Sequence, residues 1–319
     1  MNNMGKYIGK RLINSLVILI VATICIFIMV KASGMNPVLA TLQGGRMSET
    51  ALQDKLEHYG LNQPVPLQYL YWLKNIATGN FGESVKYKVP VESLIHTSLP
   101  ITLGLAIISF IVSQVLAISL GVVSAVNKGK LIDKIISILT VLFFSVPVFF
   151  LSLLYIVIIA KHFPGYSYTG SFDTLGEYLN RILIPVIVIS THEIALITKI
   201  TRTAMIDQLS SEYVLALKAR GIPERVIIWK HALKNSLVPV ITIAGLQFGA
   251  LIVGCVMVEN IFSLNGIGRL MVQCVMVGDI SVIQCIALII IVTFLLSNFV
   301  VDALYAIIDP RVRVQQKNS

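Results

Sequence analysis

Charged residues are scarce in this chain of 319 residues. Asp, Glu, Lys and Arg make up 13% of the sequence, whereas hydrophobic residues make up 56%. A soluble globular domain carries roughly 25% charged residues. The hydrophobic residues gather in runs close to the ~20 residues that cross a ~30 Å hydrocarbon core. The composition excludes a soluble enzyme and predicts a protein that crosses a bilayer several times.

The motifs of several reaction classes are also absent. No GxxxxGK[ST] phosphate-binding loop occurs, so the sequence shows no means of holding nucleotide phosphates. His192-Glu193 begins like the zinc motif HExxH, but position 196 is Leu. The cysteines show no CxxC spacing, which indicates neither a metal site nor a disulfide; they are Cys25, Cys255, Cys274 and Cys285. We therefore expect no catalytic residue, metal or cofactor in this chain.

Six apolar runs predict an all-α polytopic membrane protein with six transmembrane helices. They lie near 12–30, 99–126, 132–160, 181–201, 237–258 and 280–307. The first run resembles a signal peptide, but its length exceeds the 7–15 residues typical of a signal peptide's apolar core, so we expect a retained helix. The third run is long enough to be tilted, or to be kinked at Pro147.

The distribution of Lys and Arg predicts the orientation. Most of the 25 basic residues fall in the N-terminus, the second and fourth connections and the C-terminus, which the positive-inside rule assigns to the cytoplasm. Topology and anionic inner-leaflet lipid then account for the net charge of +9, without a nucleic-acid partner. The expected parts are a cytoplasmic N-terminus and first helix at 1–31, an extracytoplasmic helical segment at 32–98, a five-helix core at 99–310 and a cytoplasmic tail at 311–319.

The outer segment contains two helix signals of its own. Thr50 and Gln53 form a capping-box pattern, and Gly60 supplies a stop. A second helix is predicted from Pro66 to Ala77, with an apolar face that suits a membrane interface. Two interpretations stay open for this layer: a lid over the helix bundle, or a dock for an external partner.

The cytoplasmic connection at about 202–236 contains a predicted helical hairpin. A helix is expected at 212–220, a Gly-Ile-Pro turn at 221–223 and a basic helix at 225–235, with Pro239 beginning the next span. Such a hairpin can project into a cleft on another protein. It can equally lie as an amphipathic element on anionic lipid.

This connection resembles the corresponding loop of ABC importer permeases, in the dipeptide, oligopeptide and nickel branch. The resemblance rests on Glu212-Tyr-Val-x-x-x-Lys-Ala-Arg-Gly221-Ile, continuing to His231-Ala-Leu-Lys-Asn235-Ser-Leu-Val-Pro239. Further matching pieces occur in order: Leu61-Asn-Gln-Pro64 with Gln68-Tyr69, Gly79-Asn-Phe-Gly82-Glu-Ser84, Glu259-Asn-Ile-Phe262 with Gly266-Ile-Gly-Arg269, and Asp302 with Asp309-Pro-Arg311-Val-Arg313. The resemblance thus covers nearly the whole chain.

The resemblance implies a type I importer permease in the bacterial inner membrane, with a second homologous permease, two ATPase subunits and an extracytoplasmic substrate-binding protein as partners. ATP and Mg²⁺ would be held by the ATPase subunits, and the hairpin would dock on them. Leu215-Ala216-Leu217 stand where the broader permease signature has Glu-Ala-Ala. The expected coupling residues are Ala216, Ala219, Arg220, Gly221, Ile222 and Glu224.

The cargo is predicted as nickel, free or chelated, with di- or oligopeptides as the alternative. Val282-Ile-Gln-Cys285 and Glu259-Asn-Ile-Phe262 look more like nickel permeases, whereas the coupling loop suits a peptide permease equally well. Polar groups within spans are pathway candidates; here they are His192, Glu193, Gln247, Glu259 and Asn260. For His192 and Glu193 the alternatives are pairing with a residue on a neighbouring helix, or lining an inward-facing water cavity. An ion-driven secondary transporter is a more distant interpretation, since no inverted repeat is evident.

Overall fold

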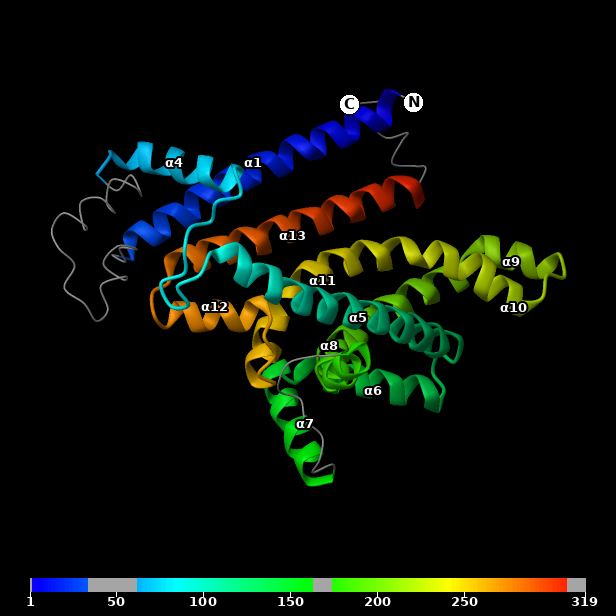
Figure 1. Ribbon diagram of the computed structural model, residues 1–319. Helices are drawn as coiled ribbons and strands as arrows, with labels where there is room; N and C mark the ends of the chain where they lie inside the picture. Colours follow the sequence, from blue (N-terminus) through cyan, green and yellow to red (C-terminus); the bar gives the residue numbers. More distant parts are fainter. Residues whose placement is uncertain (1, 34–61, 163–173, 309–319) are drawn as a thin grey trace. The chain divides into compact units, whose positions relative to one another are not determined.

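The computed structural model describes residues 2–33, 62–162 and 174–308, which are almost entirely helical (Figure 1). The all-α prediction is confirmed. The helices of this part are α1 (Asn2–Ala32), α4 (Val65–Ala77), α5 (Val91–Val126), α6 (Leu131–Ser145), α7 (Val148–His162), α8 (Leu175–Leu209), α9 (Glu212–Ala219), α10 (Glu224–Val226), the π-helix η1 (Ile227–Ala232), α11 (Leu233–Ile261), α12 (Ile267–Val275) and α13 (Ile280–Ile308). The helix expected between Thr50 and Gly60 and the tail at 311–319 lie outside the described residues.

Five helical segments in the described part are long and apolar enough to cross a membrane, and a sixth is obtained if α6 and α7 count as one broken span. The predicted kink at Pro147 is confirmed in its place. The change of direction is larger than expected for one kinked helix, since α6 and α7 are separate helices bent by 102° at the break. Val146 is extended (φ −84°, ψ 124°). A residue that precedes a proline avoids the helical region, so Pro147 ends α6.

Pro239 does not begin a span, contrary to the prediction. It lies inside a helical segment that runs from Glu224 to Ile261, through η1 and α11. A proline can be accommodated within a membrane helix when other groups satisfy the carbonyl that it frees. The second arm of the hairpin and the following span therefore form one continuous helical segment.

The chain divides into two compact units. The first comprises Met1–Arg11, Leu103–Leu264 and Phe294–Ser319, and the second comprises Leu12–Thr102 and Asn265–Thr293. In the first unit α8 packs against α6, α7 and α11. It also runs parallel to α5, since Ser190 donates to the carbonyl of Ser109 (3.1 Å) and Thr198 to that of Ala117 (3.3 Å).

Small residues allow α5 and α8 to approach closely. Every fourth residue along the contact face of α5 is small and buried: Ser109, Ser113, Ala117, Gly121 and Ala125. A Cβ atom on Gly121 would lie 2.5 Å from the Cβ of Thr201 and 3.0 Å from the carbonyl oxygen of Thr198. Small residues at this spacing bring membrane helices together along their backbones.

A buried carboxylate ties the turn between α5 and α6 to α8. Arg202 donates Nε to Oδ1 of Asp133 (2.6 Å) and Nη2 to Oδ2 (2.8 Å). Ser124 donates its hydroxyl (2.6 Å) and Gly129 its backbone N–H (2.8 Å) to the same carboxylate. Asp133 is 4% exposed. Bidentate charge-assisted bonds fix orientation as well as distance, so this contact sets how α6 lies on α8.

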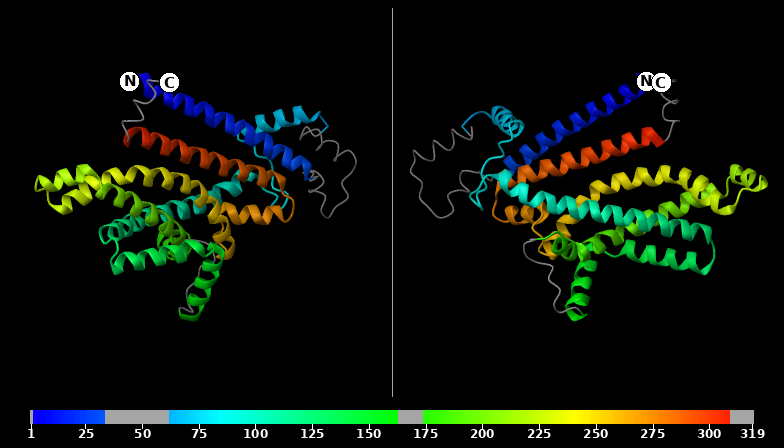
Figure 2. Two further views of the ribbon diagram at one scale, coloured as in Figure 1. Left: turned by 180° about the vertical axis from the view of Figure 1, so that it is seen from behind. Right: turned by 45° about the vertical axis from the view of Figure 1, so that its right-hand side comes forward.

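In the second unit α4 lies beside α1 (Figure 2). The hydroxyls of Thr23 and Tyr69 are hydrogen-bonded (2.9 Å), and the rings of Phe27, Tyr69 and Trp72 lie 5.5 to 6.1 Å apart. The predicted helix with an apolar face is confirmed, and its aromatic side chains contact α1.

A second buried carboxylate, that of Asp279 just before α13, accepts hydrogen bonds from the turn before α5. Oδ2 of Asp279 accepts from the hydroxyl of Ser84 (2.5 Å) and the backbone N–H of Lys86 (3.1 Å). Tyr87 donates its hydroxyl to Oε1 of Gln273 (2.6 Å) near the end of α12. Sequence reasoning predicted neither α12 nor this contact.

Removing one partner of the Asp133–Arg202 contact leaves the other without its hydrogen bonds. Hydrogen bonds to charged groups are worth roughly 1.5–3 kcal/mol, so we expect Asp133→Ala to lower the free energy of unfolding by about 2 kcal/mol. Thermal unfolding of the detergent-solubilised protein measures the loss. The double variant Asp133→Ala/Arg202→Ala should lose less than the two single variants added together. Strictly additive losses would show that the two side chains act independently.

Candidate functional site

The predicted hairpin is present at one end of the first unit, where α9 and α10 form its two arms (Figure 1). Gly221 has φ +71°. Its N–H donates to the carbonyl of Lys218 (2.9 Å), and the N–H of Ile222 donates to that of Leu217 (3.2 Å). These two bonds form a Schellman motif, which needs a residue in the left-handed region. Glycine adopts that conformation without strain.

The base of the hairpin is anchored and its tip is exposed. Val214 and Ile227 are buried at the base. Asn235 donates to the hydroxyl of Tyr213 (3.2 Å), which bonds to Oε1 of Gln208 (3.1 Å). Among the predicted coupling residues, Ile222 is half-buried and the others are exposed: Ala216, Ala219, Arg220, Gly221 and Glu224. Sequence reasoning did not select the exposed apolar residues beside them, Leu215, Val226 and Trp229.

His192 and Glu193 lie on α8 close to the break between α6 and α7. The ring of His192 stacks on Phe144, the second-last residue of α6, with centroids 4.9 Å apart and an interplanar angle of 18°. Glu193 is 5% exposed. Its Oε2 and the Nδ1 of His192 have no hydrogen-bond partner among the described residues. The structure therefore places two unsatisfied polar atoms beside the broken span.

The other predicted pathway residues lie on α11. Gln247 is half-buried, Glu259 is fully buried, and Asn260 donates to the carbonyl of Val256 one turn earlier (2.7 Å). Glu259 and Asn260 are in the last turn of α11, about 36 Å along the helix from Asn235, at 1.5 Å per residue. Glu259 also lies twelve residues after Gln247, about 18 Å along the helix, so the predicted residues do not form one cluster.

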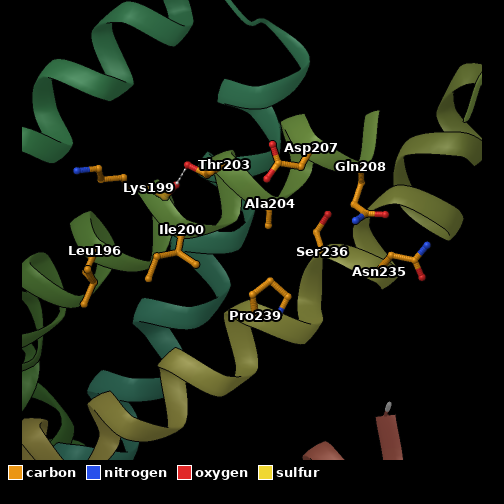
Figure 3. A pocket seen from close by; sticks show the side chains of 10 residues that line it. All are labelled: Leu196, Lys199, Ile200, Thr203, Ala204, Asp207, Gln208, Asn235, Ser236 and Pro239. Carbon is orange, nitrogen blue, oxygen red and sulfur yellow. Dashed lines mark hydrogen bonds between the residues drawn. The ribbon is translucent and has the colours of Figure 1, made fainter. Parts of the chain in front are cut away.

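A groove of about 490 Å³ opens between α8 and α11 next to the hairpin (Figure 3). Its lining combines opposite charges, amides, hydroxyls and apolar groups: Leu196, Lys199, Ile200, Thr203, Ala204, Asp207, Gln208, Asn235, Ser236 and Pro239. Sequence reasoning missed it. The spacing of Lys199, Thr203 and Asp207, four residues apart on one helix face, is a signal that could have indicated it.

The groove and the hairpin share hydrogen-bonded residues. Gln208 and Asn235 line the groove, and both bond to the hydroxyl of Tyr213 on α9. Figure 3 shows Ala204 and Pro239 between the two helices, with Gln208, Asn235 and Ser236 gathered at one end. Tyr213 of α9 therefore contacts two of the residues that form this end of the groove.

Residues 117–314 match the family described as "Binding-protein-dependent transport system inner membrane component", and residues 4–106 match the N-terminal family of such membrane components. The chain belongs to this permease family. The resemblance noted from the coupling loop is thereby confirmed, and the protein is a multi-pass permease of the ABC importer class.

Two bacterial relatives illustrate the match. The permease is 35% identical to the oligopeptide transport system permease protein AppB of Bacillus subtilis over 316 residues, covering 97% of this chain and 99% of that protein. It is 32% identical to the dipeptide transport system permease protein DppB of Alkalihalophilus pseudofirmus over 333 residues, covering 97% of this chain and all of that protein.

A solved structure, an inward-facing form of the MetNI methionine ABC transporter, matches with a TM-score of 0.57. The match covers 68% of the permease and 97% of the solved chain, and the two sequences are 16% identical. At this identity the likeness shows the fold alone. It confirms the predicted type I permease fold.

The unsatisfied carboxylate of Glu193 should respond to neutralisation differently from that of Asp133. An unpaired buried charge opposes folding, so Glu193→Gln should leave the unfolding temperature unchanged or raise it. Asp133→Asn should lower it, because that carboxylate accepts four hydrogen bonds. Thermal unfolding of both variants in detergent compares them, and an equal loss for both would contradict the difference in their surroundings.

Proposed function

We propose that this permease is the translocating subunit of an ATP-driven, binding-protein-dependent importer of short peptides. The observation that carries this is the match, over nearly its whole length, to permeases named for oligopeptide and dipeptide transport. The nickel prediction finds no support in these relatives, so the peptide alternative becomes the favoured cargo. An ion-driven transporter is disfavoured by membership of a binding-protein-dependent family.

ATP-driven movement of the ATPase subunits would be passed to the permease through the hairpin. ATP and Mg²⁺ would be bound by two partner ATPase subunits, a second permease would complete the pathway, and a substrate-binding protein would deliver cargo from outside. Both termini would face the cytoplasm of a bacterial cell. The exposed tip around Gly221 and Arg220 suits docking in a cleft of the ATPase.

Contacts between α6 and α8 in the first unit would support such coupling. Helix α6 is attached to α8 at two points, through Asp133 with Arg202 and through Phe144 with His192. From Leu209 back to Glu193, α8 is one uninterrupted helix of about 24 Å, at 1.5 Å per residue. Rigid-body displacement of the hairpin would therefore move Glu193 and the end of the broken span together.

Reconstitution of the complete importer in liposomes tests the cargo. The subunits are this permease, its second permease, the ATPase subunits and the binding protein. We expect ATP-dependent accumulation of labelled trialanine that excess unlabelled trialanine abolishes and excess Ni²⁺ leaves intact. Uptake without ATP would contradict an ABC importer, and ATP-dependent Ni²⁺ uptake insensitive to trialanine would reinstate nickel.

Gly221→Pro tests the hairpin. Proline cannot adopt φ +71° and lacks the N–H that donates to Lys218, so the Schellman motif is lost. We expect the stimulation of ATP hydrolysis by peptide-loaded binding protein to fall at least tenfold in the reconstituted importer.

Gly79 provides the matched control. It ends α4 in the same way, with φ +79° and an N–H donating to Ile76 (3.0 Å), and a side chain there would meet no atom within 4 Å. Gly79→Pro breaks an equivalent turn away from the hairpin. With the binding protein at saturating concentration, so that weaker docking on the outer segment is compensated, the stimulation should stay within about twofold of the parent. Equal losses in both variants, or full stimulation in Gly221→Pro, would refute the assigned role of the hairpin.

A further inference from the structure

We propose that the groove between α8 and α11 is a binding subsite for a short peptide with free termini, held as a zwitterion beside the coupling hairpin. The proposal rests on the peptide importer function above and adds to it a location, a ligand length and the charged groups that hold the ends. Since the groove adjoins the hairpin, the subsite would lie at the cytoplasmic end of the pathway.

The two charged residues of the groove lie at a separation that fits such a ligand. Lys199 and Asp207 are eight residues apart on α8, which is about 12 Å along the axis. An extended chain spans at most ~3.3–3.6 Å per residue, so about three to four residues match this separation. Neither charged group has an ion-pair partner in the described part of the chain. The ammonium of Lys199 can pair with a peptide carboxylate, and the carboxylate of Asp207 can pair with a peptide α-amino group.

The surface between the charges suits a peptide backbone of any sequence. Gln208 and Asn235 present side-chain amides, which can both donate to and accept from peptide groups. Ala204, Ile200 and Pro239 contribute an apolar surface to the lining (Figure 3). The volume of about 490 Å³ lies within the range of roughly 300–1,000 Å³ that is usual for small-molecule sites. Contacts to termini and backbone give affinity without selecting particular side chains.

Binding there would be connected to the hairpin. Asn235 and Gln208 also bond to the hydroxyl of Tyr213. A peptide that bonds to these amides therefore contacts the residues that hold α9 at its base. This distinguishes the groove from a passive opening between two helices.

Peptide binding to the nucleotide-free importer in nanodiscs, without the binding protein, tests the proposal. The probe is radiolabelled trialanine. We expect saturable binding that weakens at least threefold for N-acetyl-trialanine and for trialanine amide, because each lacks one terminal charge. Equal binding of the blocked and unblocked peptides would overturn the proposal.

Charge variants locate the binding in the groove. Lys199→Gln and Asp207→Asn should each weaken trialanine binding about three- to tenfold, the size expected for a single charge-assisted bond in an open site. The swapped variant Lys199→Asp/Asp207→Lys should restore affinity to within about threefold of the parent, because the zwitterion can bind in the reverse direction. Lys128→Gln, an exposed lysine after α5 and outside the groove, is the matched control and should bind as the parent does.

The remaining outcomes separate this proposal from the function on which it rests. Parent-like binding by both single variants would reject the groove while ATP-dependent trialanine uptake by the parent still upheld the importer function. Absence of ATP-dependent trialanine uptake by the parent would reject the peptide importer function itself. Dissociation of the single variants from the second permease in size-exclusion chromatography would identify the groove as a subunit interface and overturn the proposal.

Discussion

The arrangement of helices in the first unit depends on the bidentate contact of Arg202 with Asp133. Helix α8 carries His192 and Glu193, supplies one wall of the groove and leads directly into the hairpin. Because Arg202 lies between these features, its bonds to Asp133 fix the helix that joins them to α6 and to the turn after α5. The close approach of α5 at Gly121 supports α8 from another side. Without these contacts, a displacement of the hairpin could tilt α8 within the unit and leave the rest of the unit in place.

Apolar periodicity and length were enough to predict the helical spans, since crossing a bilayer demands long apolar runs whatever the surroundings. Helix ends were predicted less well because tertiary packing sets them. Helix α5 begins at Val91, where its first turns pack against α12 and α13 in a buried cluster that includes Ile267 and Val282. The sequence around Pro239 suggested a helix start, yet the chain continues straight through it. Proline is a weaker boundary signal in a membrane helix than in water.

The hairpin could be predicted because its turn depends on local chemistry, in which Gly221 follows a helix and bonds within five residues. The two buried carboxylates could not. Asp133 and Asp279 each bind partners that come from other segments, and Ser84 is 195 positions from Asp279. Nothing in a single sequence pairs such positions. The groove was not predicted for the same reason, since Asn235 and Asp207 become neighbours only after α8 and α11 pack. His192 and Glu193 were found because lone polar groups in an apolar run are visible from composition.

The break between α6 and α7 also constrains where water lies. Helix α6 has 15 residues and is about 22 Å long, which is short of the ~30 Å hydrocarbon core. If α6 starts at one face of the bilayer, its last carbonyl groups would lie within the hydrocarbon layer, where lipid chains offer no hydrogen bonds. Phe144 places this end against His192, beside the unsatisfied oxygen of Glu193. The end of α6, the imidazole of His192 and the carboxyl of Glu193 would together favour water at this depth of an otherwise apolar layer.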